Sequence, residues 1–472
     1  MEGSRLLTLV ESLNKKEVRE LRKFLRSPFF NQRADVVELF EFITERVFTL
    51  KMLPTKEQAF NTLYPGQDHD AQQVRYAMSW LLKAIEQYLA LQPWLADERQ
   101  QKIELARAYR EKRLPKHFQQ TMQQLRRQQE QQPIRNAEFF EYEYRIQLEQ
   151  YAFTASRKRL SEHNLQEISD TVDLAFIARK LRQTCFLLSH QAVYKREYDF
   201  GLLEEALQFV DRKGLLRIPT IAGYYHCYHA LRGVEPEHHF QHFKAILLHQ
   251  NHLFPADEAR DLYLLAINYC IRELNAGREA YAREGLDLYK EGFRTEMLLQ
   301  EGQLSRFTYR NAVAMALKEG ELSWAETFIR EYQNRLPKEH RESMYSFSLA
   351  RLAYVRRQYG KALEYLQRSE YQDLLLNLAA KTLMIKAFYE LEEFDTLESH
   401  LEAMKVFLRR KDIIGYHRRN YRNIIRYTQK LLHLNWNDRG EVEGLRKTIE
   451  AEEVLTERAW LLEQVEGERG DV

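Results

Sequence analysis

The sequence predicts an all-α protein, in which a small N-terminal helical module precedes a superhelix of helical hairpins. Glycine and proline are scarce, with 17 and 10 among 472 residues, which favours long helices joined by short loops. No stretch alternates apolar and polar residues with Val, Ile and Thr enriched, so no sheet is expected. Between Ala325 and Leu397, contact residues recur at a nearly constant spacing, which is typical of stacked helical hairpins.

The composition limits the classes of protein. Lysine and arginine (71) nearly balance aspartate and glutamate (69), so the chain as a whole is neither a polyanion binder nor an acidic protein. The cysteines Cys185, Cys227 and Cys270 are far apart among apolar or aromatic neighbours, and we expect buried free thiols in a reducing compartment. We find no secretion signal and no run of about 18 apolar residues, so we expect a cytoplasmic protein without a membrane span.

Residues 1–95 are expected to form the N-terminal helical module. Asn14 followed by Glu17 predicts a capping box, in which the two residues satisfy each other's free backbone amides at a helix start. Apolar residues at helical spacing predict a second helix near 33–48. A third, long helix is predicted to stop at Pro93, because proline removes a backbone donor and disfavours helix in the residue before it.

The remaining chain is expected to be helical throughout, in three segments. Residues 96–304 read as an irregular array of helical hairpins, and residues 305–435 as regular repeats. Residues 436–472 read as capping helices followed by an acidic tail. A repeat array needs such terminal units because its last apolar face would otherwise meet water.

Three residues mark the regular part of the array. Ala325, Ala362 and Leu397 each follow a predicted helix start, at the position where two paired helices would touch. They are 37 and 35 residues apart. A period of this size in a purely helical sequence predicts one helical hairpin per repeat.

The residues Leu349-Ala350, Tyr359 and Ala362 give the chain a resemblance to the tetratricopeptide repeat, which pairs two helices in about 34 residues. The resemblance extends over about residues 305–411. It implies an interaction scaffold, in which the first helix of each pair lines a concave groove that takes an extended peptide or a partner helix. A protein or peptide partner is therefore expected.

The same resemblance implies which side chains line that groove. They are Arg310, Phe347, Arg351, Tyr354, Lys386 and Tyr389. Its three cations recur once per repeat, with tyrosines one turn further on, and such a column suits an acidic or aromatic-bearing peptide. The alternative is that these are ordinary exposed helix positions, which are often arginine or lysine.

A second candidate surface lies between Lys405 and Lys430, where nine basic residues and one acid, Asp412, give a net charge of +8. Four of them are spaced to form one row along a helix, at Arg418, Arg422, Arg426 and Lys430. A basic row with interleaved tyrosines is typical of phosphate contact, so a nucleic-acid-associated factor is the alternative function. The competing interpretation is an outer helix whose charges meet glutamates of a neighbouring helix.

Seven histidines occur between His226 and His252. His238 and His242 share a helix face, as metal ligands can, but no zinc-protease pattern or paired cysteines accompany them. We therefore interpret the histidines as satisfied polar positions of an aromatic-rich helix pair and expect no metal.

No catalytic signature is found in the sequence. Phosphate loops, nucleophile elbows and dinucleotide fingerprints are absent, and the isolated glycines form no stretch that could cradle a phosphate. We expect neither enzyme activity nor a cofactor. The expected function is a non-enzymatic scaffold that binds a peptide or helix of a protein partner, and the oligomeric state stays open.

Overall fold

The chain is all-α in the part that the computed structural model describes, which is residues 1–68, 70–157, 163–194, 196–410 and 415–467. These ranges contain no strand, and their nearest approach to one is an isolated bridge between Gln300 and Gln303. The chain divides into two compact units, residues 1–177 and 178–472. The division falls inside helix α9 (Leu165–Tyr194).

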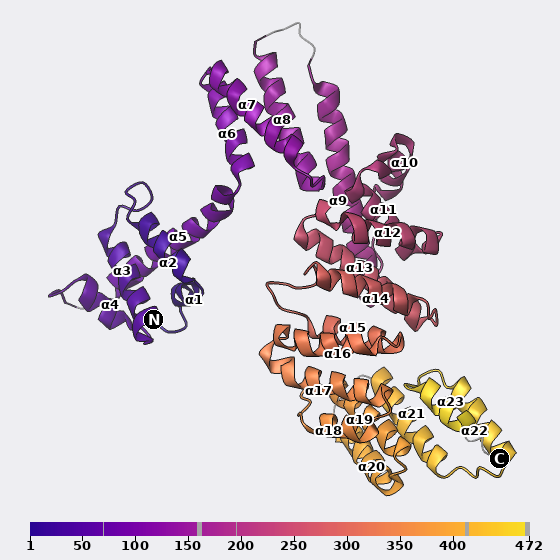
Figure 1. Ribbon diagram of the computed structural model, residues 1–472. Helices are drawn as coiled ribbons and strands as arrows, with labels where there is room; N and C mark the ends of the chain where they lie inside the picture. Colours follow the sequence, from indigo (N-terminus) through magenta and orange to yellow (C-terminus); the bar gives the residue numbers. More distant parts are fainter. Residues whose placement is uncertain (69, 158–162, 195, 411–414, 468–472) are drawn as a thin grey trace. The chain divides into compact units, whose positions relative to one another are not determined.

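The first unit begins with the predicted helical module (Figure 1). Its helices are α1 (Arg5–Glu11), α2 (Lys15–Leu25), α3 (Ala34–Thr44), the π-helical turn η1 (Glu45–Leu50), α4 (Lys56–Leu63), α5 (Ala71–Ala96), α6 (Glu98–Glu111), α7 (Pro115–Gln131), α8 (Ala137–Ala155) and the start of α9. The capping box at the start of α2 is confirmed, because Asn14 Oδ1 accepts from the Glu17 amide at 3.0 Å and Glu17 Oε2 accepts from the Asn14 amide at 2.8 Å.

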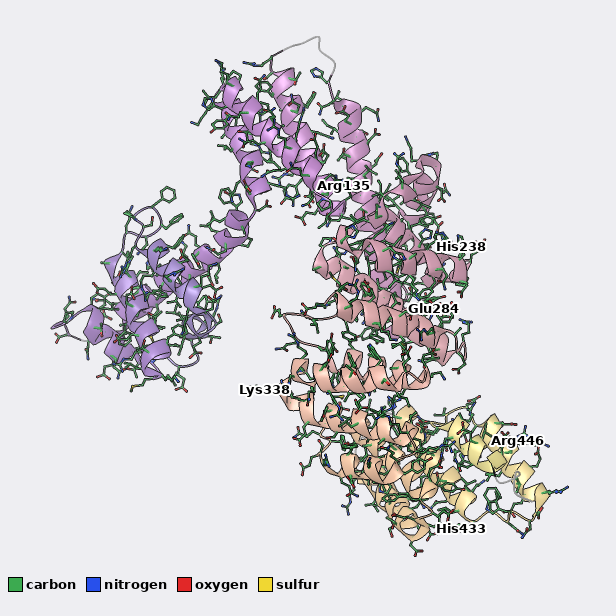
Figure 2. All side chains as sticks on the ribbon, in the orientation of Figure 1. Arg135, His238, Glu284, Lys338, His433 and Arg446 are labelled. Carbon is green, nitrogen blue, oxygen red and sulfur yellow. The ribbon has the colours of Figure 1, made fainter. Side chains whose placement is uncertain are left out.

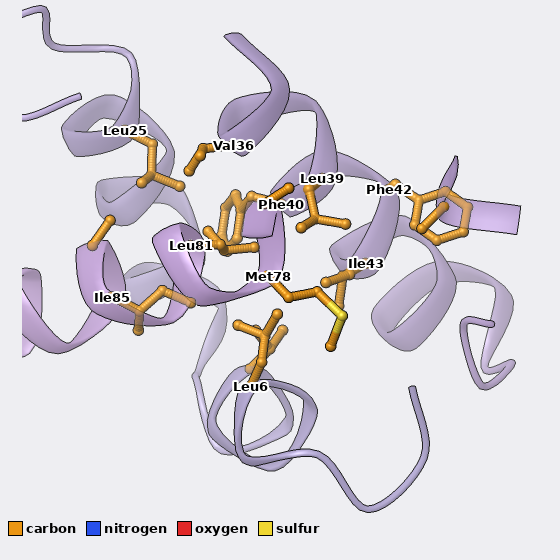
Figure 3. Packing of buried hydrophobic residues seen from close by; sticks show 14 of the residues in the cluster. Leu6, Leu25, Val36, Leu39, Phe40, Phe42, Ile43, Met78, Leu81 and Ile85 are labelled. Atoms are coloured by element: carbon orange, nitrogen blue, oxygen red, sulfur yellow. The ribbon is translucent and has the colours of Figure 1, made fainter. Parts of the chain in front are cut away.

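Burial of apolar side chains holds α1 to α5 together. Figure 3 shows Leu39, Phe40 and Ile43 of α3 facing Leu81 and Ile85 of α5, and all five are fully buried. Each buried aliphatic or aromatic side chain contributes roughly 1.5–3 kcal/mol relative to exposure. This core explains why the apolar spacing of the sequence could be read as a separate module.

The predicted end of the long helix at Pro93 is wrong. Helix α5 continues through Pro93 to Ala96, and Asp97 then begins α6 by accepting from the Gln100 amide at 2.9 Å. Pro93 has no amide to donate to the Leu89 carbonyl, and the helix ends within one turn of this break.

The second unit contains the helical pairs (Figure 1). Its helices are the remainder of α9, α10 (Leu203–Lys213), η2 (Leu215–Arg217), α11 (Pro219–Arg232), α12 (Pro236–Gln250), η3 (Asn251–Leu253), α13 (Ala256–Asn275), α14 (Tyr281–Arg294), α15 (Arg306–Lys318), α16 (Leu322–Tyr332), η4 (Gln333–Arg335), α17 (Lys338–Val355), α18 (Tyr359–Gln367), α19 (Leu374–Glu390), α20 (Phe394–Arg410), α21 (Gly415–Leu432), α22 (Arg439–Ala451) and α23 (Arg458–Gly467). From α11 to α20, each helix packs on the next, which gives the predicted helical-hairpin superhelix. Ala325, Ala362 and Leu397, predicted to lie where paired helices touch, have no exposed surface.

One turn geometry closes five successive first helices. The first or second residue after the last helical one has a positive φ angle, at Gly233, Gly277, Gly320, Arg357 and Glu392. In every case the next amide donates back to a carbonyl five residues earlier, over 2.8–3.2 Å. This C-terminal cap satisfies carbonyls that the helix leaves free. The repeated cap supports a structural repeat that begins well before residue 305.

The C-terminal segment contains the two expected short helices, α22 and α23. The last five residues of the acidic tail lie outside the described residues. Within the described ranges, no helix combines the length and apolarity that crossing a membrane requires. All three cysteines are buried and free, as predicted.

Candidate binding groove

Helix α13 presents a polar stripe among buried faces. Asn268, Arg272 and Asn275 are exposed. Their neighbours Leu265 and Tyr269 on the same helix are buried. The spacing of four and three residues places the exposed side chains on one face of the helix. Neither Asn268 nor Asn275 has a hydrogen-bond partner among the described residues, so two amide side chains remain free on this face.

A hollow of about 820 Å³ opens beside this stripe, between α9, α11 and α13. Gln191 of α9 also lines it, and the buried Oε1 of this side chain has no partner among the described residues. The described charged residues that line the hollow are Arg196, Glu197, Arg232 and Arg272. The hollow therefore combines unsatisfied amide groups with an excess of positive charge.

A second hollow of about 390 Å³ continues the first one along α13, α15 and α17. Ile271 and Asn275 line both hollows, which makes them one continuous surface. Arg351 adds positive charge to the second hollow, and Lys318, which also lines it, already pairs with Glu279. We call the residues lining these two hollows the open groove. It is formed by first helices of successive pairs.

A buried carboxylate fixes the helices beneath the open groove. Glu258 of α13 pairs with Arg182 of α9 at 3.2 Å, and its other oxygen accepts from the Tyr224 hydroxyl of α11 at 3.2 Å. Burial, followed by the nearby Glu258 charge, raises the pKa of Tyr224 well above its ordinary value, so the phenol stays a donor. One carboxylate thereby joins the first helices of three pairs, which holds the groove walls in register.

The sequence-predicted groove residues lie on α15, α17 and α19. Arg310 and Arg351 are half-buried, whereas Phe347 is buried against Tyr371 and is not presented to a partner. Burial lowers the pKa of Arg351; the Glu457 charge opposes this effect and the Arg310 charge adds to it. The positive charge of Arg310 therefore slightly disfavours the charged form of Arg351 on the neighbouring first helix.

The downstream end of the predicted groove is covered by the C-terminal helix α23. Lys386 pairs with Glu457 at 2.7 Å, and the rings of Tyr389 and Trp460 meet edge to face at 5.5 Å. The Tyr354 hydroxyl donates to Glu390 at 3.1 Å. We call Tyr354, Lys386, Tyr389 and Glu390 the covered end. The structure thus brings three of the predicted residues together, but beneath a segment of the same chain.

The predicted basic row lies on α21. Arg422, Arg426 and Lys430 are exposed, and Arg418 is half-buried. Arg426 pairs with Glu452 at 2.7 Å. Lys411 and Asp412, which were counted in the net charge of the segment, lie outside the described residues.

Other cations surround a small hollow between α20 and α21, of about 340 Å³, lined by Lys405, Arg409, Arg422 and Arg426. Two neighbouring charges are balanced, because Arg419 pairs with Glu452 at 3.2 Å and Lys405 with Glu402 at 2.6 Å. Some cations of this region therefore pair with glutamates of the same or neighbouring elements. Others form a basic patch around the hollow without a paired carboxylate among the described residues.

Histidines of α11 and α12 form a stacked cluster, and Figure 2 labels one of its members, His238 on α12. His226 and His239 share a hydrogen bond at 2.8 Å between their Nδ1 atoms, and His226 stacks on His242. Burial lowers the pKa of His226 and that of His239 to about 4, so both rings are neutral near pH 7. Among the described residues, no group of three or more ligands is placed to hold a metal ion.

The prediction that these histidines are satisfied polar positions needs one correction. Both ring nitrogens of His229 are buried and have no hydrogen-bond partner among the described residues. The ring instead stacks on His239 at 4.6 Å and lies against Tyr225 at 4.4 Å. Ring packing between neutral imidazoles therefore takes the place of hydrogen bonding at this residue.

The open groove was missed by sequence reasoning, although its signal is present. Asn268, Arg272 and Asn275 are polar residues at helical spacing in the second half of α13, and they could have been read as a groove-facing stripe. They were overlooked because α13 lies before residue 305, outside the segment in which the repeat spacing is regular. Comparison with protein families, with curated proteins and with solved structures gives no match for this chain.

Proposed function

We propose that this chain is a non-enzymatic scaffold of the tetratricopeptide-like kind, which holds an acidic segment of a protein partner along the open groove. The observation that carries the proposal is the continuity of the two hollows through Ile271 and Asn275. Together they run across five first helices, from α9 to α17, without crossing a second helix of any pair. A surface of this form suits an elongated ligand better than a compact one.

The side chains of the open groove define the chemistry of that ligand. A free amide such as Asn268 or Asn275 can both donate to and accept from an extended backbone, independently of the ligand's own sequence. The arginines and Lys318 favour carboxylates, and arginine can bind one in a bidentate manner. Arg272 already pairs through Nε with Glu273 at 3.0 Å, so only its other guanidinium N–H groups can bind the ligand.

A site-specific crosslink tests where the partner lies. A photo-crosslinking residue in place of Asn275 is expected to capture a protein from lysate of the native cell, whereas the same residue in place of the exposed Asn334 on η4 is not. Adding the Asn268→Ala substitution should reduce the yield at position 275 at least tenfold. Nuclease treatment should leave that yield unchanged.

Equal yields at the two positions would refute the groove as the binding surface. Loss of the crosslinked product after nuclease treatment would favour the second candidate function, a nucleic-acid-associated factor. That candidate draws its support from the basic hollow between α20 and α21, where Arg422 has no carboxylate within ion-pair distance among the described residues. Its binding would have to fall steeply with salt concentration.

A further inference from the structure

Three polar contacts join the C-terminal segment to the covered end. The Glu457 carboxylate meets Lys386 Nζ at 2.7 Å. Trp460 Nε1 and Gln464 Nε2 both donate to Glu390 Oε1, at 2.9 and 3.1 Å. Since the Tyr354 hydroxyl donates to the same oxygen, Glu390 acts as the acceptor around which the contact is built.

Apolar burial accompanies these polar contacts. Trp460 and Leu461 are 4% and 0% exposed, and Lys386 Nζ lies 5.9 Å from the centre of the indole ring. Trp460, Leu461 and Gln464 lie on one face of α23, and Glu457 directly precedes the helix. A helix that presents this pattern to a groove is a general mode of peptide recognition between proteins.

Two features indicate that α23 is held reversibly. The helix has ten residues, and an isolated helix of that length is marginal in water, so its order depends on the groove. Glu457, which makes the ion pair, has a φ angle of +55°, a left-handed conformation that costs free energy in a residue with a side chain. Its carboxylate is also 37% exposed, so solvent and salt weaken the pair.

The covered end continues the open groove. Arg351 lines the second hollow of the open groove, and the charge of Glu457 acts on its guanidinium group. Tyr354 lies one turn further along α17, and Lys386, which pairs with Glu457, sits 4.7 Å from the centre of the tyrosine ring. A segment that lies in the open groove and extends past Arg351 would therefore meet the carboxylate of Glu457.

We propose that the covered end is a docking site for a partner helix that has a carboxylate directly before its first turn, an indole three residues later and an amide four residues after that. Helix α23 occupies this site until such a helix displaces it. The inference rests on the proposed function, because it assigns the downstream part of the same groove to the same class of partner. The inference adds which chemical groups the partner helix carries. It also adds that α23 competes with that helix for the covered end.

A peptide with the sequence of residues 452–467 tests whether the site accepts a helix in trans. The labelled peptide is titrated by fluorescence anisotropy against the full chain and against a full-length variant with Glu457→Lys and Trp460→Ala, in which α23 is released. We expect the variant to bind at least tenfold more tightly than the unchanged chain. The matched control Glu463→Lys reverses a charge on the exposed face of α23 and should behave like the unchanged chain.

Charge exchange makes the test specific for Lys386. Adding Lys386→Glu to the released variant should abolish binding of the native peptide. A peptide carrying Lys in place of Glu457 should bind this variant more tightly than the native peptide does. If the released variant keeps its helical circular dichroism and still binds no peptide, α23 is only a structural cap and the inference is wrong. If that variant unfolds, Glu457→Lys alone serves, with a tenfold gain still required.

Partner binding separates this inference from the proposed function. The partner captured at Asn275 should be recovered in greater amount by the released variant, and the peptide should compete with it. Peptide binding without such competition would overturn the displacement, while crosslinking at position 275 would still support the scaffold. Conversely, competition by the peptide without crosslinking at position 275 would confine the partner to the covered end and refute the proposed open groove.

Discussion

The open groove and the covered end are built from the same kind of element but are used differently. Both lie on first helices of successive pairs, and both carry cations beside polar or aromatic side chains. In the open groove, Asn268 and Asn275 make no hydrogen bond to other described residues. At the covered end, Lys386 and Glu390 are fully engaged by Glu457, Trp460 and Gln464.

The difference shows that free hydrogen-bonding capacity distinguishes a binding surface from a structural one. A buried or half-buried polar group without a partner costs free energy, unless a ligand or water satisfies it. The covered end has resolved that cost within the chain. The amides of Asn268 and Asn275 in the open groove are exposed, so water satisfies them and they contribute little to the stability of the free protein.

The largest expected effect is at the covered end. Leu461→Ala removes a fully buried side chain from the contact of α23, and such changes cost about 2–5 kcal/mol. Because α23 is terminal and short, this loss should release the helix instead of unfolding the second unit. Hydrogen exchange should accelerate in residues 458–467 and remain unchanged in α13. Leu462→Ala, at a half-buried position of the same helix, should have a much smaller effect.

Uniform acceleration of exchange over the second unit would contradict this prediction. It would mean that α23 is an integral part of the repeat core. In that case the covered end would be a permanent contact and no longer comparable with the open groove.

Lowering the pH is expected to have an effect of intermediate size on stability. It acts on the histidines of α11 and α12, and α11 lines the open groove. In the folded chain the pKa of His226 and that of His239 lie at about 4, below the ordinary value of 6.5, so the unfolded chain binds more protons between these pH values. The contribution of the neutral His226 and His239 to the free energy of unfolding is complete above pH 6.5. It is lost as the pH falls toward 4. A full proton difference would correspond to roughly 1.4 kcal/mol per pH unit, and solvent screening reduces the loss below this limit because His239 is only half-buried.

Hydrogen exchange at several pH values localises that loss. Helices α11 and α12 should open first as pH falls, before α17 to α20. His226→Leu together with His239→Gln should reduce the pH dependence, whereas His252→Gln, at an exposed position, should not. An identical pH dependence in the double variant would show that other groups control acid unfolding.

Much of the fold could be predicted from the sequence because it depends on interactions between residues that are close in the chain. The capping box at Asn14, the apolar spacing of α3 and the contact residues Ala325 and Ala362 all act through neighbours within one or two helices. The helical pairs before residue 305 were harder to recognise. Their caps at Gly233 and Gly277 are spaced by 44 residues, whereas Arg357 and Glu392 are spaced by 35.

The groove itself depended on contacts that sequence spacing does not reveal. The prediction placed Lys386 and Tyr389 on one surface, and the structure places them there, but nothing in the repeat indicated that Trp460 would reach them across 70 residues of chain. Conversely, Phe347 follows the groove spacing and is nevertheless buried. Whether a helix position faces solvent, a partner or a terminal segment is decided by distant parts of the chain.

The smallest expected effect compares the two regions directly. Asn275→Ala should change the free energy of unfolding by no more than roughly 0.5 kcal/mol, as is usual for an exposed residue without partners. Lys386→Ala should lower it more, because Glu457 loses its partner and the rings of Tyr354 and Trp460 lose a neighbouring cation. Paired denaturant titrations of the two variants measure this difference. If Asn275→Ala destabilises the chain as much as Lys386→Ala does, the amide carries a structural load, and the distinction between an open and a covered groove fails.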